Sequence, residues 1–350
     1  MKKIAIFNHK GGVSKTTTSF NLGWSISKLG KKVLLVDADS QCNLTMYALG
    51  DEKFNCHYLE SPNDNIYSAL IPAFKSEPRL IQPIECPQIT ENLYLLPGHL
   101  DFTENEVQMG ISMQLSSSFS SMANLPGAIN YLLEKTAQKY DIEYVIIDMN
   151  PSLSAINQDI FISSDYFIIP NSPDLFSLMS VDSLCRVLPA WENWARKARP
   201  LFENATYPLP QTTPKFLGYT INDFNLSHGQ PQLTFREFMD QISSKVVTTL
   251  IPRFEENIML LEQENYSQAY DEMKNSAEKH HIEYPDYYCL AQISNFNKLI
   301  ALSNAQSIPV FELSLDKEVL HEGQTRTLAW FRFLYDALAK RVLRLTNDEH

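Results

Sequence analysis

Residues 10–17 read Lys-Gly-Gly-Val-Ser-Lys-Thr-Thr and lie between an apolar run, residues 3–8, and a helical pattern. The glycine pair leaves the backbone bare, so that consecutive N–H groups can converge on phosphate oxygens. A helix that begins near Lys15 adds the positive end of its dipole. Lys15 is then placed against the outer phosphates, and the Thr16 hydroxyl is placed to bind the Mg²⁺ that bridges them. The octet therefore predicts a loop that binds a polyphosphate.

The ordinary phosphate-loop pattern, Gly-x-x-x-x-Gly-Lys-Ser/Thr, is absent because His9 and Ser14 occupy its two glycine positions. The octet instead resembles the deviant Walker loop, Lys-Gly-Gly-x-x-Lys-Thr, of the ParA/MinD family of ATPases. In that family the first lysine, here Lys10, reaches across a dimer to the partner's nucleotide. Ser14 replaces the customary glycine, which costs about 1–2 kcal/mol if the position needs a positive φ. The alternative is a plain glycine turn with lysines nearby.

This resemblance implies a set of nucleotide contacts and two catalytic lysines. The residues implied to hold ATP are Lys10, Gly11, Gly12, Val13, Ser14, Lys15, Thr16 and Thr17. Lys10 and Lys15 are also implied to act on the phosphates during hydrolysis.

Two acids follow the next apolar run. Residues 31–37, Lys-Lys-Val-Leu-Leu-Val-Asp, read as a buried strand, and the chain continues as Ala-Asp-Ser-Gln-Cys-Asn. Carboxylates at the C-terminal edge of a parallel strand face the ligand crevice. The segment is similar to the family's Asp-x-Asp-Pro-Gln-x-Asn, with Ser40 in place of the proline. The resemblance implies that Asp39 orients or activates the attacking water and that Asp37 supports the magnesium shell.

A third acid ends another β-branched run. Residues 144–152 read Tyr-Val-Ile-Ile-Asp-Met-Asn-Pro-Ser, the form expected of a Walker B strand, in which Asp148 holds Mg²⁺ through water. Thr16, Asp37 and Asp148 are thus the expected metal site. Phosphoryl transfer needs charge around the γ-phosphate, and two lysines, a metal ion and one carboxylate supply it. The family has Asp-x-Pro-Pro-Ser here, and Asn150 replaces the first proline, so that the stiffness of this segment is in question.

Two further segments resemble family segments that contact the base. Residues 216–223, Phe-Leu-Gly-Tyr-Thr-Ile-Asn-Asp, look like the strand whose terminal amide, here Asn222, hydrogen-bonds adenine. An amide can both donate to and accept from a purine edge. Residues 250–253, Leu-Ile-Pro-Arg, match the family's Ile-Pro-Arg turn, which implies that Pro252 contacts the nucleotide. Each segment taken alone is equally well an ordinary strand end or proline turn.

The order of the patterns predicts the fold class. A chain of 350 residues that is 44% hydrophobic can build a large core, and strands alternate with helices throughout. We expect an α/β fold with a doubly wound, mostly parallel sheet and helices on both faces. A single elaborated P-loop ATPase domain is expected over residues 1–350, with insertions at about 52–88, 188–214 and 262–286. Further strands are expected at 92–97, 166–170 and 309–313, and helices at 15–29, 127–140, 176–199, 233–250 and 325–345.

Cysteine spacing and hydropathy argue against several classes of protein. The five cysteines show no Cys-x-x-Cys or Cys/His spacing, so that neither a zinc site nor a disulfide framework is predicted. The same absence disfavours the iron–sulfur reductase relatives of this fold. No stretch approaches the ~20 apolar residues of a membrane span. We therefore expect a cytoplasmic protein.

Net charge bears on the partners. The chain carries 29 basic and 41 acidic residues, a net charge of −12, which disfavours nonspecific DNA binding unless the basic groups cluster. One cluster, residues 191–199, reads Trp-Glu-Asn-Trp-Ala-Arg-Lys-Ala-Arg and suits DNA, an acidic partner or a membrane surface. A helix with its tryptophans packed inward and its cations solvated is the favoured interpretation. The last helix has an apolar stripe from Trp330 to Leu345, as a membrane-targeting helix of the MinD type has, but core packing is favoured.

Two functional classes remain open. The first, which we prefer, is a partition-type ATPase in DNA or cargo segregation, such as plasmid partition. In this class ATP drives homodimerisation, the dimer holds DNA or another scaffold, and a partner protein, ParB-like or an effector, stimulates slow hydrolysis. The second is a regulatory or scaffold ATPase that controls a separate effector and binds little DNA. Metabolic phosphotransfer to a small molecule is a third alternative.

Overall fold

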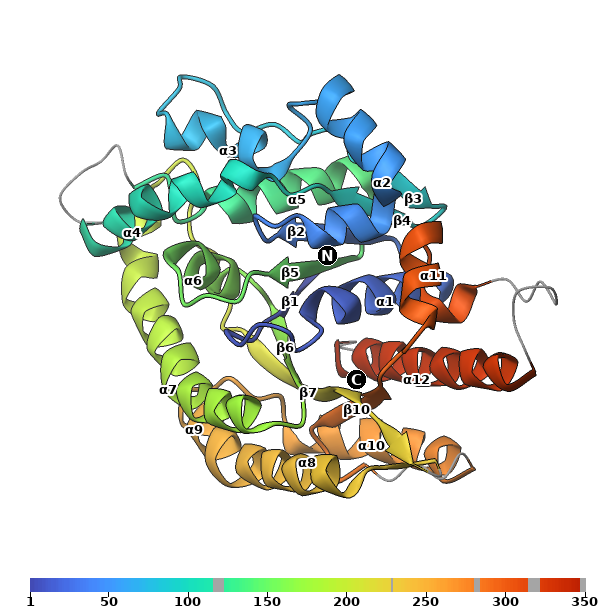
Figure 1. The fold of residues 1–350 in the computed structure, drawn as a ribbon. Helices are drawn as coiled ribbons and strands as arrows, with labels where there is room; N and C mark the ends of the chain where they lie inside the picture. The colour runs from blue at the N-terminus through green and yellow to red at the C-terminus, as the bar shows by residue number, and fades with distance from the viewer. Residues whose placement is uncertain (116–122, 228, 280–283, 314–321, 347–350) are drawn as a thin grey trace.

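An eight-stranded sheet runs through the molecule in the order β10-β7-β6-β1-β5-β2-β4-β3 (Figure 1). The computed structural model describes residues 1–115, 123–227, 229–279, 284–313 and 322–346. Neighbouring strands are parallel except for the β3–β4 pair at one edge. The mostly parallel sheet predicted from the alternation of strands and helices is thereby confirmed.

The three central strands are built from buried aliphatic runs. β1 (Lys2–Ile6), β2 (Val33–Ala38) and β5 (Tyr144–Met149) lie side by side, and nearly all of their residues are buried. Because both faces of these strands are covered, their sequences are continuously apolar rather than alternating. The register pairs Asp37 with Asp148. The acids that end these strands therefore meet at the C-terminal edge of the sheet.

The remaining strands extend the sheet on both sides of this centre. They are β3 (Gln88–Thr90), β4 (Leu93–Leu96), β6 (Tyr166–Asn171), β7 (Lys215–Phe224) and β10 (Cys289–Ser294). A separate pair of two-residue strands, β8 (Leu226–Ser227) and β9 (Gln230–Pro231), follows β7. Gly218 has a φ of 149°, and a Cβ there would lie 2.3 Å from the Tyr288 carbonyl oxygen, so that only glycine lets β7 and β10 approach.

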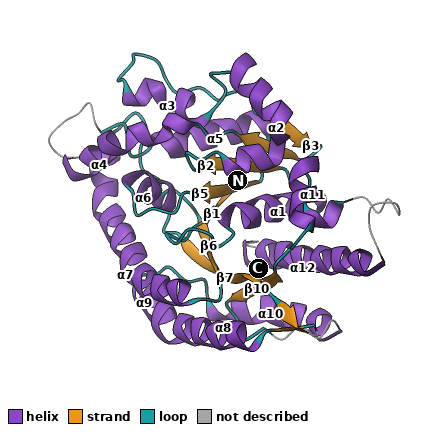
Figure 2. Ribbon diagram, viewed as in Figure 1, coloured by secondary structure: helices purple, strands orange, loops and turns teal. Residues whose placement is uncertain are grey.

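Helices surround the sheet in two groups (Figures 1 and 2). In one group α1 packs on α2 and α12, and α12 packs on α10. In the other group α3, α5, α6 and α7 follow one another, and α7 packs on α8 and α9. The helices are α1 (Lys15–Lys28), α2 (Asn43–Glu60), α3 (Ile66–Phe74), α4 (Glu106–Leu115), α5 (Ala128–Tyr140), α6 (Ala155–Ile162), α7 (Leu175–Ala198), α8 (Leu233–Lys245), α9 (Ile251–Glu256), α10 (Gln263–Lys279), α11 (Leu299–Gln306) and α12 (Glu322–Thr346).

The strand expected at residues 309–313 is wrong. This segment forms a 3₁₀ turn, Val310–Glu312, although Val310 and Phe311 are buried. The apolar run reflects the burial of its side chains and not the pairing of a strand. Pro309 also lacks the N–H that a sheet ladder needs. The edge strand β10 instead lies earlier in the chain, at Cys289–Ser294.

The three stretches expected to be insertions carry helices of their own. Residues 52–88 contain α3 and the second part of α2, which follows a kink at Gly50 with a φ of 75°. Residues 188–214 contain the end of α7, and residues 262–286 contain the whole of α10, which packs on α12. The single-domain organisation stays a prediction.

A buried ion pair holds the second of these stretches in place. The Arg199 guanidinium donates to both carboxylate oxygens of Glu192, at 2.9 and 3.0 Å, and its Nε donates to the Pro210 carbonyl oxygen at 2.8 Å. The Thr213 hydroxyl adds a 2.7 Å bond to Glu192. Both charged side chains are almost completely buried and fully paired, which is the arrangement that a buried charge requires.

The last helix is a core element. Its stripe of apolar side chains, which includes Phe331, Leu334, Leu338, Val342 and Leu345, is buried, and α12 packs on α1 and β10. The favoured interpretation of this stripe is confirmed. Within the described part of the chain, no helix has the length and apolar character needed to cross a membrane.

Asp159 on α6 is completely buried, and neither of its carboxylate oxygens has a hydrogen-bond partner among the described residues. Burial raises the pKa of Asp159 well above its ordinary value, so that the fold favours the neutral form of this carboxyl. The unfolded chain ionises it above about pH 4. The penalty on folding is therefore absent below that pH and grows as the pH rises towards the folded-state pKa.

Asp159→Asn is expected to raise the free energy of unfolding at pH 7 by roughly 2 kcal/mol, because the amide never ionises. Urea unfolding at pH 5 and pH 8 measures this, and the gain should be larger at pH 8. Asp240→Asn, which replaces an exposed acid on α8, is the matched control and should change little. A gain that is equal at both pH values would contradict the assignment.

Candidate functional site

The loop between β1 and α1 adopts left-handed backbone angles at two positions. Gly12 has a φ of 73°, and Ser14, immediately before α1, has a φ of 63° and a ψ of 35°. Ser14 thus takes a positive φ, which costs a residue other than glycine about 1–2 kcal/mol. A Cβ at Gly11 or Gly12 would meet nothing within 4 Å, so that this loop presents open backbone to its surroundings. The first N–H groups of α1 have no partners within the helix, as at any helix N-terminus.

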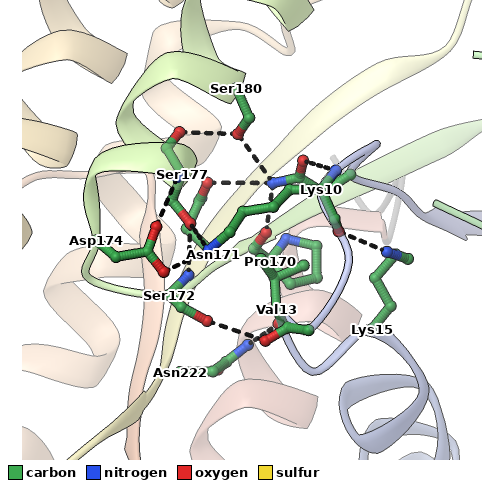
Figure 3. Close-up of polar contacts among 12 residues, drawn as sticks. Lys10, Val13, Lys15, Pro170, Asn171, Ser172, Asp174, Ser177, Ser180 and Asn222 are labelled. Atoms are coloured by element: carbon green, nitrogen blue, oxygen red, sulfur yellow. Dashed lines mark hydrogen bonds and ion pairs between the residues drawn. The ribbon is translucent and has the colours of Figure 1, made fainter. Parts of the chain in front are cut away.

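Lys15 is buried at the start of α1, and its Nζ donates to the Lys10 carbonyl oxygen at 2.9 Å (Figure 3). Burial lowers the pKa of Lys15, while the charges of Asp148 and Asp39 oppose this shift. The ammonium therefore lies between the loop and the acids of the sheet edge. A phosphate group placed in the loop would replace the carbonyl with a stronger acceptor.

Asp148 at the end of β5 has one carboxylate oxygen free. Its Oδ1 accepts from the Ser19 hydroxyl at 3.2 Å, whereas Oδ2 is buried and makes no hydrogen bond to the described residues. Burial and the charge of Asp37 raise the pKa of Asp148, and the Thr16 hydroxyl and Lys15 lower it. An unpartnered buried carboxylate oxygen beside a threonine hydroxyl is a donor set that suits Mg²⁺ or its water ligands.

Both carboxylate oxygens of Asp37 already accept hydrogen bonds from groups of the same chain. Its Oδ2 accepts from the Thr45 backbone N–H at 2.8 Å and from the Thr45 hydroxyl at 2.6 Å, and its Oδ1 accepts from the Asp39 N–H at 3.3 Å. Burial raises the pKa of Asp37 to about 6, against these hydrogen bonds. The geometry suits the supporting role expected for Asp37 rather than direct contact with a metal ion.

Asp39 lies just beyond β2, where the chain turns into α2. Its Oδ1 accepts from the Gln41 N–H at 3.0 Å, and Cys42 ends the turn in a left-handed conformation with a φ of 54°. Asp39 is buried beside Lys15, whose pKa its charge raises. The structure therefore brings Asp39 and Asp148 beside Lys15, with Asp37 next to these two acids.

Lys10 is bound within its own chain. Its Nζ forms an ion pair with the Asp174 carboxylate and donates to the Ser177 hydroxyl at 3.1 Å (Figure 3). Both partners lie at the start of α7. Asp174 is missing from the sequence expectations because Ser-Pro-Asp before a helical pattern is explained by helix capping alone.

Asn222 at the end of β7 lies against the loop. Its side-chain NH₂ donates to the Val13 carbonyl oxygen at 3.2 Å and to the Thr220 hydroxyl at 3.0 Å, while its Oδ1 is buried without a partner in the described chain. A cavity of about 170 Å³ adjoins it. The cavity is lined by residues that include Ser14, Thr17, Asn222, Asp223, Asn295 and Phe296.

Comparison with known proteins matches residues 1–197 to a family model described as an AAA domain. The chain belongs to this family. The sporulation initiation inhibitor protein Soj of Bacillus subtilis is 34% identical over 183 residues, which are 52% of this chain and 63% of Soj. A virulence plasmid ParA family protein of Chlamydia psittaci is 30% identical over 188 residues, which are 53% of this chain and 62% of that protein. The chain thus spans somewhat under two thirds of these relatives.

Solved structures agree with the family. A protein of Corynebacterium diphtheriae has a TM-score of 0.58 at 26% identity, over 70% of this chain and 88% of that one. The apo form of McdA from Cyanothece has a TM-score of 0.61 at 17% identity, over 98% of this chain and 99% of that one, which shows a shared fold. The resemblance to ParA-like P-loop ATPases drawn from the loop is confirmed.

Pro252 is the second residue of α9, and the Phe254 ring two residues later packs against Phe167 and Phe216 at the starts of β6 and β7. Asn222 lies six residues after Phe216, near the other end of β7. The contact implied between Pro252 and the nucleotide stays a prediction.

The segment after β5 is stiffened by an amide rather than by the missing proline. The Asn157 side chain donates to the Asn150 carbonyl oxygen at 2.8 Å, to its side-chain oxygen at 3.0 Å and to the Ser152 carbonyl oxygen at 2.7 Å. Asn157 lies in the first turn of α6. Asn157 and Asn150 are seven residues apart, and the sequence contains no pattern that predicts this contact.

The basic cluster at residues 191–199 does not form one surface. Trp191 is buried, and the Trp194 indole N–H donates to the Met113 carbonyl oxygen at 3.2 Å. Arg199 is buried in its ion pair, which leaves Arg196 and Lys197 as the exposed cations. The favoured interpretation is confirmed for the inward packing of Trp191 and for the exposure of Arg196 and Lys197, but it is wrong for Arg199, which is buried.

Two other features bear on ligands. A cavity of about 660 Å³ is lined by α5 and the segment around Arg199 and Pro210, and none of the loop residues or acids described above lines it. Over the described residues, no group of three or more His, Cys, Asp or Glu side chains is arranged to hold a metal ion by itself. A magnesium ion at Asp148 would accordingly draw its other ligands from Thr16, water and phosphate.

Proposed function

We propose that the chain is an ATP-hydrolysing switch of the ParA type. The observation that carries this proposal is the convergence of Lys15, Asp39 and Asp148 beside an open glycine loop at the start of α1. Cations, a metal-binding carboxylate and a water-directing carboxylate are the groups that phosphoryl transfer uses. The overall reaction converts ATP and water to ADP and phosphate.

Each residue has a distinct part in this proposal. The loop N–H groups and the α1 N-terminus bind the phosphates, and Lys15 moves from the Lys10 carbonyl to the outer phosphates. Thr16 and Asp148 would hold Mg²⁺, and Asp37 keeps the edge of β2 in place through Thr45. The magnesium ion supplies charge neutralisation for the β- and γ-phosphates when bound. Asp39 orients the attacking water and accepts a hydrogen bond from it.

The cavity beside Asn222 is the proposed base pocket. Its volume of about 170 Å³ suits one purine ring system, and the free Asn222 Oδ1 can accept from the adenine amino group. The amide NH₂ is already bound to Val13 and Thr220 oxygens. These hydrogen bonds fix the orientation of the amide and leave its Oδ1 as the unpaired acceptor.

Homodimerisation on ATP binding, a stimulating partner protein and a role in DNA or cargo segregation complete the proposal. The relatives named Soj and ParA support this class of function. A second function, control of an effector protein without DNA, is favoured by the net charge of −12 and by the burial of Arg199 in the basic cluster. A cytoplasmic location is proposed for either function.

Phosphate release from ATP by the purified chain tests the activity. We expect slow turnover in the presence of Mg²⁺. EDTA should abolish it, because Mg²⁺ neutralises the phosphates, and excess Mg²⁺ should restore it. Lys28→Ala, which removes an exposed lysine of α1, is the control and should be as active as the wild type. Wild-type turnover that resists EDTA, or wild-type turnover no faster than that of Lys15→Ala, would contradict the proposal.

A DNA gel shift with ATP separates the two functions. Titration at salt concentrations from 50 to 200 mM should give a steep loss of affinity if the dimer neutralises several phosphates. No shift at any of these concentrations would select the effector-control function instead.

A further inference from the structure

Glu106, the first residue of α4, binds the N-terminus of a neighbouring helix. Its Oε1 accepts from the Ala155 backbone N–H at 2.5 Å, and its Oε2 accepts from the Ile156 N–H at 3.2 Å. Both N–H groups belong to the first turn of α6 and have no partners within that helix. The two helices pack on each other (Figure 1), and a Cβ at Gly110 of α4 would lie 3.8 Å from that of Ala155. A carboxylate of α4 thereby holds the start of α6, where the helix dipole favours a negative charge.

The start of α6 in turn holds the segment that directly follows Asp148. The Asn157 side-chain NH₂ donates to the Asn150 carbonyl oxygen at 2.8 Å, and the Asn157 backbone N–H donates to the Ser154 hydroxyl at 3.2 Å. Asn157 is completely buried, so that these bonds are shielded from water. A shift of the first turn of α6 would therefore pull on the short segment between Asp148 and Ser154.

Glu106 is itself anchored beside the other acids of the sheet edge. Eight residues earlier in the chain, the Gly98 N–H donates to the Thr45 hydroxyl at 3.0 Å, and this hydroxyl donates to the Asp37 carboxylate at 2.6 Å. A Cβ at Gly98 would lie 3.0 Å from the Asp37 Cγ, so that a side chain at this position would crowd the carboxyl. A 3₁₀ turn, Leu100–Asn105, joins Gly98 to Glu106. The Glu106 carboxylate therefore links the segment after β5 to the end of β2.

We propose that Glu106 is a positioning residue for Asp148, which fixes the segment after β5 relative to β2 and so sets where the unpartnered Asp148 Oδ2 lies. This inference rests on the proposed function, in which Asp148 would hold Mg²⁺ or its water ligands. Groups that orient a metal ligand without touching the metal change metal affinity or activity about 10–100-fold. A helix cap alone, in contrast, changes the stability of the protein and not its use of Mg²⁺.

Glu106→Gln and Glu106→Ala remove the contact in two steps. Glutamine keeps the length of the side chain and one acceptor oxygen but loses the negative charge, whereas alanine removes both acceptors. Glu104→Gln is the matched control, because Glu104 is an exposed acid two residues earlier whose carboxylate accepts from the Tyr67 hydroxyl at 3.1 Å. The control removes the same charge from the same segment, two residues away from the contact.

Three measurements separate positioning from helix capping. Hydrogen exchange of a peptide that covers residues 149–157, in the nucleotide-free protein, reports whether Glu106 holds this segment. ATP affinity, titrated with Mg²⁺ and again with EDTA, gives the factor by which Mg²⁺ strengthens binding. Urea unfolding gives the stability of each variant and establishes that it is folded.

Glu106→Ala is expected to speed exchange in residues 149–157 several-fold and to reduce the Mg²⁺ factor about tenfold, with unchanged ATP affinity in EDTA. Glu106→Gln should lie between Glu106→Ala and the wild type, and Glu104→Gln should change neither quantity. Unchanged exchange would overturn the contact itself. Faster exchange with an unchanged Mg²⁺ factor would overturn the positioning role and leave the proposed function standing. A wild type that binds ATP equally well with Mg²⁺ and with EDTA would overturn both.

Discussion

Lys15→Ala is expected to weaken ATP binding about 100-fold or more. Lys15 is buried between the open loop and the acids of the sheet edge, so that its ammonium contacts the phosphates in a site with little water. Removing one partner of such a buried charge contact costs about 2–5 kcal/mol. Isothermal titration of ATP with Mg²⁺ measures the loss directly.

The fold should survive this substitution. Burial lowers the pKa of Lys15, which means that the charged side chain destabilises the nucleotide-free protein at neutral pH. Lys15→Ala should therefore unfold at the same temperature as the wild type or slightly higher. Lys28→Ala, at the other end of α1, should bind ATP normally. ATP affinity within a fewfold of wild type in a folded Lys15→Ala would remove Lys15 from the site.

Asp39→Ala is expected to slow ATP hydrolysis by about 10²–10⁴-fold, the usual contribution of a group that positions or deprotonates a nucleophile. ATP affinity should stay within a fewfold, because Asp39 is not expected to contact the phosphates. Single-turnover assays separate the two effects. The variant should accumulate as the ATP-bound dimer, since the step that releases it is blocked.

Asp51→Ala is the matched control for Asp39→Ala. Asp51 is an exposed acid within α2, the helix that follows Asp39 in the chain. It should hydrolyse ATP at the wild-type rate. Full hydrolysis by Asp39→Ala would remove Asp39 from the mechanism, and loss of ATP binding would assign it to the phosphates instead.

The sequence predicts this fold and site well where the information is local. The runs before Asp37 and Asp148 are continuous aliphatic stretches, and such runs become central parallel strands because both faces are covered. Carboxylates at their ends then meet at one edge by the register alone. The left-handed conformation at Ser14 also follows from the motif, because the family has glycine there.

Contacts between distant segments could not be predicted in this way. The Lys10–Asp174 pair depends on β6 lying beside β1. The burial of Arg199 depends on its ion pair with Glu192, which lies two helical turns earlier. The Ile-Pro-Arg likeness covers only three residues and gives no information on how α9 packs, which the contact of Phe254 with Phe216 at the start of β7 shows. Short apolar runs such as residues 309–313 report burial without deciding between strand and turn.

The central claim is that this loop and these acids bind Mg²⁺–ATP and bring two copies of the chain together. Sedimentation velocity of the wild-type chain with Mg²⁺ and either ADP or ATP tests it most directly. We expect a monomer with ADP and a dimer with ATP. A sedimentation coefficient that is the same with both nucleotides, at concentrations where titration shows that they are bound, would contradict the account.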